Sequence, residues 1–230
     1  MTAVIGPDSM GIGRQAGLER EGYCVYIPKP FQMKTDEAVR FMASHPLALL
    51  ITVDGTRPVA THIPVDVTER NGNVYVTGHI AAANPQKHTL RDNQEVLLVF
   101  QGPQAYISSS WYAVEEVPTW DYLAVHAYGT VRVLTLAELK TVLESMLIRY
   151  ESHQENGRLW ATFHPALLER EMRAIVGFEV EVTEVQAAAK MSQNRTDEDY
   201  RAIVTALEKS NDAEAQKVAE WMRNRRPQLF

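Results

Sequence analysis

The chain has 230 residues, 45% apolar and 23% charged, which is ordinary for a soluble globular protein. Its net charge of −6 and pI of about 5.7 argue against a dedicated nucleic-acid binder, which carries a basic face, and against binding to an anionic membrane surface. A single cysteine, Cys24, excludes an intrachain disulfide framework and favours a reducing, cytoplasmic location. No apolar run approaches the roughly 18 residues that span a membrane.

The first half of the chain predicts a short helix followed by strands. Residues 1–24 are Gly-rich and polar, and we expect a disordered extension. Thr35, followed by two acidic residues, predicts a helix cap, and His45-Pro46 ends that helix. Because several short strands in succession are typical of small barrels, the pattern predicts a β-barrel. The predicted strands are residues 47–53, 59–67, 74–79, 95–101, 105–108 and 124–134.

The second half is mostly helical. Thr135 and Glu138 form a capping box for a helix that ends near Tyr150. Its expected buried stripe is Leu139, Val142, Leu143, Met146, Leu147 and Tyr150.

The remaining predicted elements complete an α+β domain. They are a helix at residues 165–173, a strand at 175–182, and helices at 197–209 and 212–225, the last with Ala215, Val218, Ala219 and Met222 on one face. We expect residues 25–189 to form the barrel domain. Residues 190–230 are expected to form a helical segment packed on the barrel or on a dimer partner.

Residues 77–86 leave a strand, pass through a small-residue loop and enter a helix at Asn84-Pro85. Asn is a good N-cap and Pro suits the first helical position. The free N–H groups of a helix start suit a phosphate. The alternative, which pattern alone favours, is a plain connection whose cap satisfies only itself.

Two further segments are candidate ligand contacts. Residues 100–122 combine aromatic rings for stacking with Ser108, Ser109 and Ser110, although a barrel loop with core aromatics explains them equally well. Residues 190–195 form a polar, basic cluster able to reach an anion, and the alternative is a solvated loop at a helix start.

No motif predicts a catalytic or metal site. The histidines lack HExxH or another close metal spacing, although His62 and His79 on adjacent predicted strands can face one pocket. GxSxG, Walker A and GxGxxG motifs are absent. No helix-turn-helix stands out, and Arg223, Arg225 and Arg226 are typical of a solvated helix end.

Several motifs together resemble the PaiB family, also called FMN-binding negative transcriptional regulators. They are VYIPK from Val25, ATHIP from Ala60, GH at Gly78, NPQ from Asn84, FQGPQAYISSSWY from Phe100, VPTW from Val117 and SQNR from Ser192. The resemblance covers about residues 25–230. Family members begin at the residue that matches Val25, so we hypothesise that residues 1–24 are a mis-assigned start.

The resemblance implies a split β-barrel of the pyridoxamine-phosphate-oxidase type with peripheral helices. It also implies a homodimer that binds FMN at the subunit interface and acts as a repressor at operator sites on DNA. A flavin-dependent oxidoreductase, or a flavin or ligand sensor without DNA binding, is the alternative. Enzyme activity is the less favoured of these functions, and no catalytic residue is predicted.

In related barrels the segment after the second hairpin strand holds the FMN phosphate, usually with Ser, Arg and Lys. Here the matching residues 77–87 lack that basic pair, which leaves three alternatives. Neutral donors hold the phosphate, or Lys190 or Arg195 of this or the partner subunit supplies the charge. The third alternative is weak or absent FMN binding. Residues 106–120 then form a wall around the flavin ring or the interface. The predicted cofactor contacts are Thr61, His62, Thr77, Gly78, His79, Asn84, Gln86, Ser108, Ser109, Trp120, Lys190 and Arg195.

Overall fold

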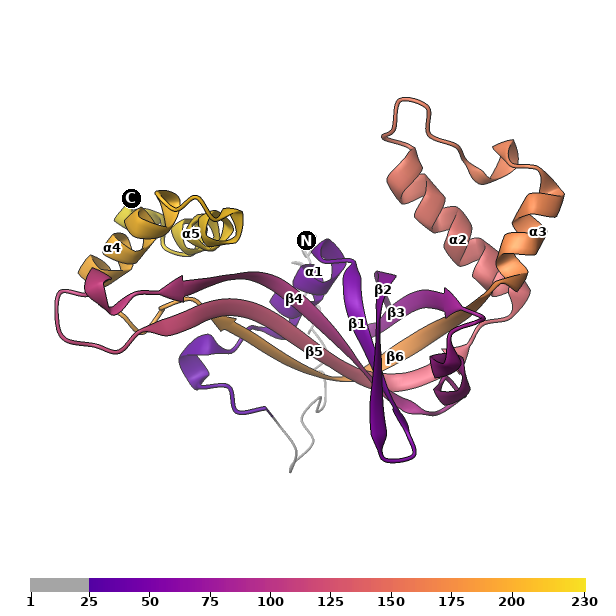
Figure 1. Ribbon diagram of the computed structural model, residues 1–230, viewed down its shortest axis with the longest axis horizontal. Helices are drawn as coiled ribbons and strands as arrows, with labels where there is room; N and C mark the ends of the chain where they lie inside the picture. Colours follow the sequence, from indigo (N-terminus) through magenta and orange to yellow (C-terminus); the bar gives the residue numbers. More distant parts are fainter. Residues whose placement is uncertain (1–24) are drawn as a thin grey trace, which may run out of the picture.

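Six antiparallel strands close into a barrel in the order β1-β2-β3-β6-β5-β4 (Figure 1). The computed structural model describes residues 25–230, so the extension and the alternative start predicted for residues 1–24 lie outside the described residues. The predicted α+β barrel with peripheral helices is confirmed. The strands are β1 (Leu47–Asp54), β2 (Arg57–Arg70), β3 (Asn73–Ala81), β4 (Glu95–Ile107), β5 (Thr119–Val133) and β6 (Ile175–Lys190).

Successive side chains along each strand point alternately into the barrel core and out to its surface. On β2, Ile63 and Val65 are buried inside the barrel, whereas His62 and Pro64, which alternate with them, are exposed. The hairpin turns before and after β2 each contain a glycine with positive φ, which is 61° at Gly55 and 83° at Gly72. The period-2 pattern therefore fixes which face of each strand a ligand can reach.

Strands β4 and β5 are longer than predicted, and together they form an arm that extends beyond the barrel (Figure 1). Gly102-Pro103 suggested a break between two strands, but the ladder with β5 resumes at Gln104, opposite Tyr122, after a register shift. Gly102 packs so closely that a Cβ atom there would lie 2.8 Å from the Phe41 ring. The expected break is therefore a bulge within one strand.

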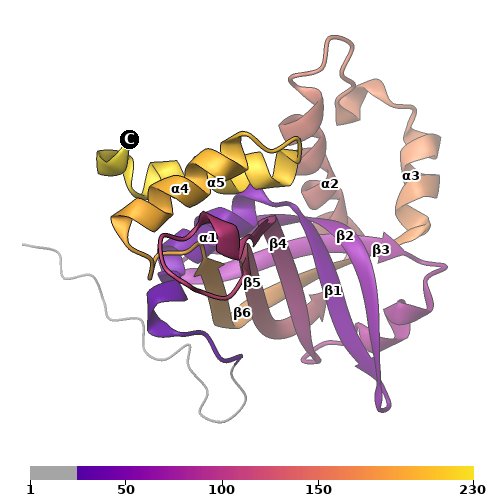
Figure 2. The same cartoon turned by 60° about the vertical axis from the view of Figure 1, so that its left-hand side comes forward.

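Three helices, α1 (Thr35–Ser44), α4 (Asp197–Glu208) and α5 (Ala213–Arg225), lie on one side of the barrel (Figure 2). Helix α1 follows the cap residue Lys34, so the prediction that Thr35 is the cap was wrong by one residue. Helices α4 and α5 form a hairpin, and α5 packs on β4 (Figure 2). The apolar face predicted for the last helix is confirmed, because all four of its residues are buried.

Helices α2 (Leu136–Glu151) and α3 (Pro165–Arg173) project from the other end of the barrel (Figure 1). The capping box of Thr135 and Glu138 is confirmed. The predicted buried stripe was wrong, because of its members only Leu139 is buried, and Tyr150 is 41% exposed. Helical periodicity shows which side chains share a face but not whether a neighbour covers that face. Leu139 packs against Gly177 of β6, whereas the other members of the stripe are only partly buried or exposed.

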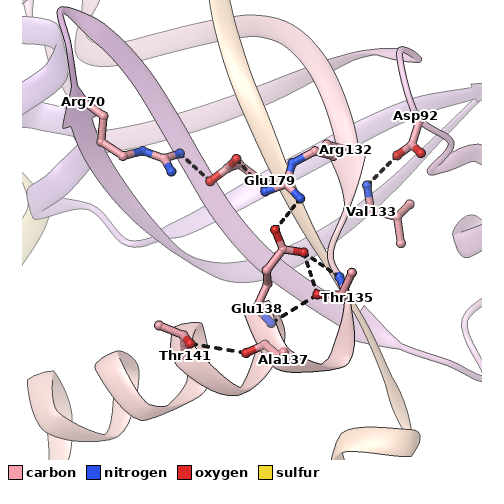
Figure 3. A network of polar contacts seen from close by, with 9 residues as sticks. All are labelled: Arg70, Asp92, Arg132, Val133, Thr135, Ala137, Glu138, Thr141 and Glu179. Atoms are coloured by element: carbon pink, nitrogen blue, oxygen red, sulfur yellow. Dashed lines mark hydrogen bonds and ion pairs between the residues drawn. The ribbon is translucent and has the colours of Figure 1, made fainter.

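A polar network holds the base of this helical pair to the barrel (Figure 3). The Glu179 carboxylate on β6 accepts from Arg70 of β2 and, at 3.0 Å, from Arg132 of β5. Arg132 also donates to Glu138 at 2.7 Å. Hydrogen bonds from Thr135, and then from Arg132, lower the pKa of Glu138 to about 2, so this carboxylate stays ionised in the cap. Within residues 25–230, no helix combines the length and apolar character needed to cross a membrane.

Candidate functional site

Three polar side chains from two separate segments meet beside the short 3-10 helix η2 (Pro85–Thr89), and we name Thr61, Asn84, Gln86 and the adjoining Lys87 the loop group. Asn84 caps η2, because its Oδ1 accepts from the Gln86 backbone N–H at 2.9 Å. Its amide Nδ2 donates to Thr61 Oγ1 at 3.0 Å, and Thr61 Oγ1 donates to Gln86 Oε1 at 2.5 Å. The structure therefore brings these predicted contacts together.

The loop group keeps hydrogen-bond donors that its internal contacts do not use. The Lys87 ammonium donates to the Ala82 carbonyl at 2.5 Å, which occupies one of its three N–H bonds. The Asn84 amide has two N–H bonds and uses one of them in its contact with Thr61. Lys87 was not among the predicted contacts, although it is the first basic residue after the loop. A cation and a spare amide N–H are donors that suit an anionic group.

His79 lies on β3, two residues before the loop begins. Its Nδ1 atom is buried and has no hydrogen-bond partner among the described residues, and burial lowers the pKa of His79. Nδ1 is thus a buried polar atom that no group among the described residues satisfies.

The other predicted residues on β2 and β3 differ in accessibility. His62 is exposed and Thr77 is buried. Gly78 faces the core, because a Cβ atom there would lie 3.1 Å from the Phe178 ring. Among residues 25–230, no three His, Cys, Asp or Glu side chains gather in a way that suits a metal ion.

The remaining predicted residues lie at the other end of the molecule, on the arm and the chain that follows β6. We name Ser108, Ser109, Trp120, Lys190 and Arg195 the arm group. Trp120 is 54% exposed and meets Tyr106 edge to face, with ring centroids 6.1 Å apart. These rings form an apolar surface in solvent, which fits a stacking platform better than a core.

The two cations of the arm group already have partners within the chain. Lys190 donates to Thr119 Oγ1 and to the Trp120 carbonyl, and burial lowers the pKa of its ammonium. Arg195 pairs with Glu116 at 3.0 Å, and its guanidinium lies 4.4 Å from the centre of the Tyr112 ring. A phosphate at either cation would therefore compete with an existing contact.

Beneath these cations lies a buried carboxylate that the sequence did not indicate. Asp121 is 0% exposed, and its Oδ2 accepts from Ser192 Oγ at 2.6 Å. Its Oδ1 has no hydrogen-bond partner among the described residues and lies 3.8 Å from Lys190 Nζ. Burial raises the pKa of Asp121 to about 6, even though Ser192 and Lys190 favour the ionised form.

Asp121 makes stability depend on pH. Because the folded pKa of about 6 exceeds the ordinary aspartate pKa of 3.8, the stabilisation from Asp121 is complete below pH 3.8 and is lost as pH rises through 6. The shift predicts a loss of about 3 kcal/mol, at about 1.4 kcal/mol per pH unit. Replacing Asp121 with Asn (Asp121→Asn) should flatten this part of the profile when unfolding by urea is compared from pH 4 to pH 8. Parallel profiles for the two proteins would contradict the assignment.

The loop group and the arm group are far apart in one chain. His79 pairs with Gly177 near the start of β6, whereas Lys190 ends that strand, opposite Tyr122. Thirteen residues separate these positions on β6, which corresponds to about 43 Å of strand at about 3.3 Å per residue. Figure 1 shows the two ends of β6 at opposite sides of the molecule. Within one chain, the position that pairs with His79 and Lys190 therefore lie at opposite ends of β6.

Comparison with known proteins decides the family. Residues 25–184 match the family model described as "Putative FMN-binding domain". The chain is 42% identical over 202 residues to "Protease synthase and sporulation protein PAI 2" of Bacillus subtilis, which covers 87% of this chain and 98% of that protein. The chain belongs to the PaiB family. The resemblance inferred from the sequence motifs is thus confirmed, and FMN is the cofactor of the matched domain family.

More distant relatives support the same fold. An uncharacterized protein of Saccharomyces cerevisiae is 30% identical over 158 residues, which cover 58% of this chain and 92% of that protein. The solved FAD and heme binding protein of Mycobacterium smegmatis has a TM-score of 0.50 at 14% identity, covering 74% of this chain and 78% of that one. A conserved hypothetical protein of Mycobacterium tuberculosis has a TM-score of 0.53 at 15% identity, covering 75% and 94%. The predicted split-barrel fold is confirmed.

Proposed function

We propose that this PaiB-family protein is a cytoplasmic homodimer that binds FMN and represses transcription. The observation that carries the proposal is the 42% identity with a protein named for protease synthesis and sporulation, along nearly the whole of its length. A regulatory role fits that name, and the matched domain family supplies the flavin.

The loop group fits the phosphate end of FMN. Lys87 and Asn84 hold the phosphate through the donors that their internal contacts leave free. We expect His79, whose Nδ1 has no hydrogen-bond partner among the described residues, to contact the cofactor as well. When bound, FMN supplies one- or two-electron redox chemistry, and the chain supplies binding and orientation.

A second copy of the chain completes the site. Along β6, the residue that pairs with His79 and the arm-group residue Lys190 are about 43 Å apart. We infer that the arm of each subunit reaches the loop group of the other, a contact that a two-fold dimer makes twice. Trp120 then stacks against the flavin ring while the other subunit holds the phosphate. The arm rings are free for such a contact, since Trp120 is 54% and Tyr106 is 49% exposed.

The C-terminal arginines are not the DNA-binding surface in this proposal. Arg223 pairs with Glu208 at 2.6 Å, and Arg225 pairs with Glu37 at 2.9 Å. Arg226 pairs with Asp197 and donates to the Gln193 carbonyl. Because these ion pairs neutralise the helix end, operator contacts come from another face of the dimer.

Two measurements on the purified protein test the proposal. We expect a flavin absorption band near roughly 450 nm, as flavins show in general. We also expect an electrophoretic mobility shift with its own promoter region that changes when FMN is added. Absence of the band would remove the flavin function, whereas a band without any shift would leave flavin binding and remove the repressor.

A flavin-dependent oxidoreductase is the second candidate, and the exposed rings of Trp120 and Tyr106 favour it. An aromatic surface in solvent beside a flavin provides a face on which a substrate can stack. Steady oxidation of NADH or NADPH by the FMN-loaded protein would support this candidate. Without such oxidation, the aromatic surface serves only the flavin and the dimer.

A further inference from the structure

The Gln86 side chain is turned away from solvent, although its loop is the proposed phosphate site. Gln86 is 2% exposed. Its Nε2 donates to the Leu50 carbonyl and to Thr52 Oγ1, each at 3.1 Å, and lies 3.3 Å from the Val59 carbonyl. Its Oε1 accepts from Thr61 at 2.5 Å. One amide therefore connects η2 to both β1 and β2.

These contacts use the donors of the amide completely. A primary amide has two N–H bonds, and three acceptors on the barrel already surround Nε2. The amide is therefore a poor candidate for direct contact with a phosphate. Asn84 and Lys87, on either side of it in the chain, keep free donors instead.

The backbone around Gln86 is fixed by the same contacts. Its N–H donates to Asn84 Oδ1 at 2.9 Å, and its carbonyl accepts from Thr89 Oγ1 at 2.7 Å. Thr89 Oγ1 also lies 2.6 Å from Thr52 Oγ1, which returns the turn to β1. Both ends of η2 are thus attached to the barrel through Gln86 and its neighbours.

We infer that Gln86 is a positioning residue for the phosphate end of the flavin, and that it does not touch the flavin itself. Its buried amide holds the turn so that Asn84 and Lys87 present their free donors together. This inference rests on the proposed function, and it replaces the predicted direct contact of Gln86 with the cofactor. In this inference, η2 lies against the phosphate of the flavin and not against its ring.

The inference predicts a loss of affinity that depends on the phosphate. Replacing Gln86 with Leu (Gln86→Leu) keeps a similar volume and removes every side-chain hydrogen bond of the amide. We expect the dissociation constant for FMN to rise about tenfold or more, because about 1.4 kcal/mol corresponds to a factor of ten. Riboflavin has the same ring but no phosphate, so its dissociation constant should change less than about twofold on that scale. Both constants follow from flavin fluorescence titration of the full chain.

Two further variants separate positioning from general damage. Gln94→Leu changes an exposed glutamine in the neighbouring turn and should alter neither constant. Thr52→Val removes one Nε2 acceptor and the contact with Thr89 at nearly constant volume, so it should weaken FMN selectively but less strongly. If the Gln86→Leu protein does not fold, the FMN and riboflavin affinities of Thr52→Val test the positioning role instead.

Each outcome decides one claim. Selective loss of FMN affinity supports the positioning role. Equal loss of FMN and riboflavin, or no loss of either, overturns that role and leaves the flavin function standing. A wild-type protein that binds neither flavin overturns the proposed function, and the positioning role with it.

Discussion

Mixing two variants that each fail to bind FMN should restore about a quarter of the wild-type sites, because each site in a two-fold dimer uses one group from each subunit. One variant lacks the loop donors (Asn84→Ala with Lys87→Ala). The other lacks the arm rings (Tyr106→Ala with Trp120→Ala). Each pair removes one half of the proposed site, so either variant alone should bind FMN at least about tenfold more weakly.

The expected fraction follows from the symmetry. When subunits of the two variants are exchanged in equal amounts, about half of the dimers contain one of each. In such a dimer, one site combines both defects, whereas the other combines the intact loop group of one chain with the intact arm group of its partner. FMN titration after subunit exchange measures the recovered sites.

A matched control separates recovery from an effect of mixing itself. A chain that carries all four changes, exchanged with either variant, has no dimer with an intact site and should recover nothing. If the two variants also recover nothing after complete exchange, the loop and arm groups do not share a flavin across the subunits. The two-chain site would then be wrong, whatever the affinity of the wild-type protein.

Gly129→Ala should destabilise the barrel by about 3 kcal/mol or more, at or above the upper end of ordinary overpacking costs. Gly129 is buried on β5, directly after the register shift between β5 and β6. A Cβ atom there would lie 2.2 Å from the Glu181 carbonyl oxygen and 2.7 Å from Val180 Cγ1. Because the nearer atom belongs to the backbone, rotation of a side chain cannot relieve the clash, and the strand itself must move.

Gly55→Ala provides the comparison. Gly55 has a φ of 61° and open space around it, so alanine there meets no neighbour and costs only the left-handed backbone conformation, about 1 kcal/mol. Urea unfolding of both variants beside the wild-type protein measures the two costs. Equal stability of the Gly129→Ala and wild-type proteins would contradict the packing at the β5–β6 irregularity.

The fold was predictable where a local pattern decides it. The strand pattern predicted a barrel, and the capping box of Thr135 and Glu138 predicted the start of α2. Local sequence patterns gave wrong predictions where packing against distant residues determines the structure. The stripe of α2 assumed a partner that most of the helix lacks, and Gly102-Pro103 suggested a break that packing against Phe41 turns into a bulge.

The candidate site was predictable only in part, because it depends on contacts between distant segments. Asn84-Pro85 indicated a cap, but no local pattern shows that Gln86 turns inward to Thr61, 25 residues earlier. The burial of Asp121 beneath Lys190 likewise depends on β5 meeting the end of β6, because its partner Ser192 is 71 positions further along the chain. The cofactor came from motifs shared with a family, not from spacing or charge.

A crystal structure of the FMN-bound protein tests the central claim most directly. We predict two flavins per dimer, each with its phosphate at Asn84 and Lys87 of one subunit and its ring against Trp120 of the partner subunit. The Gln86 amide should remain turned toward β1 and β2. A flavin held entirely by one chain, or a phosphate bound at Lys190 and Arg195, would contradict the account.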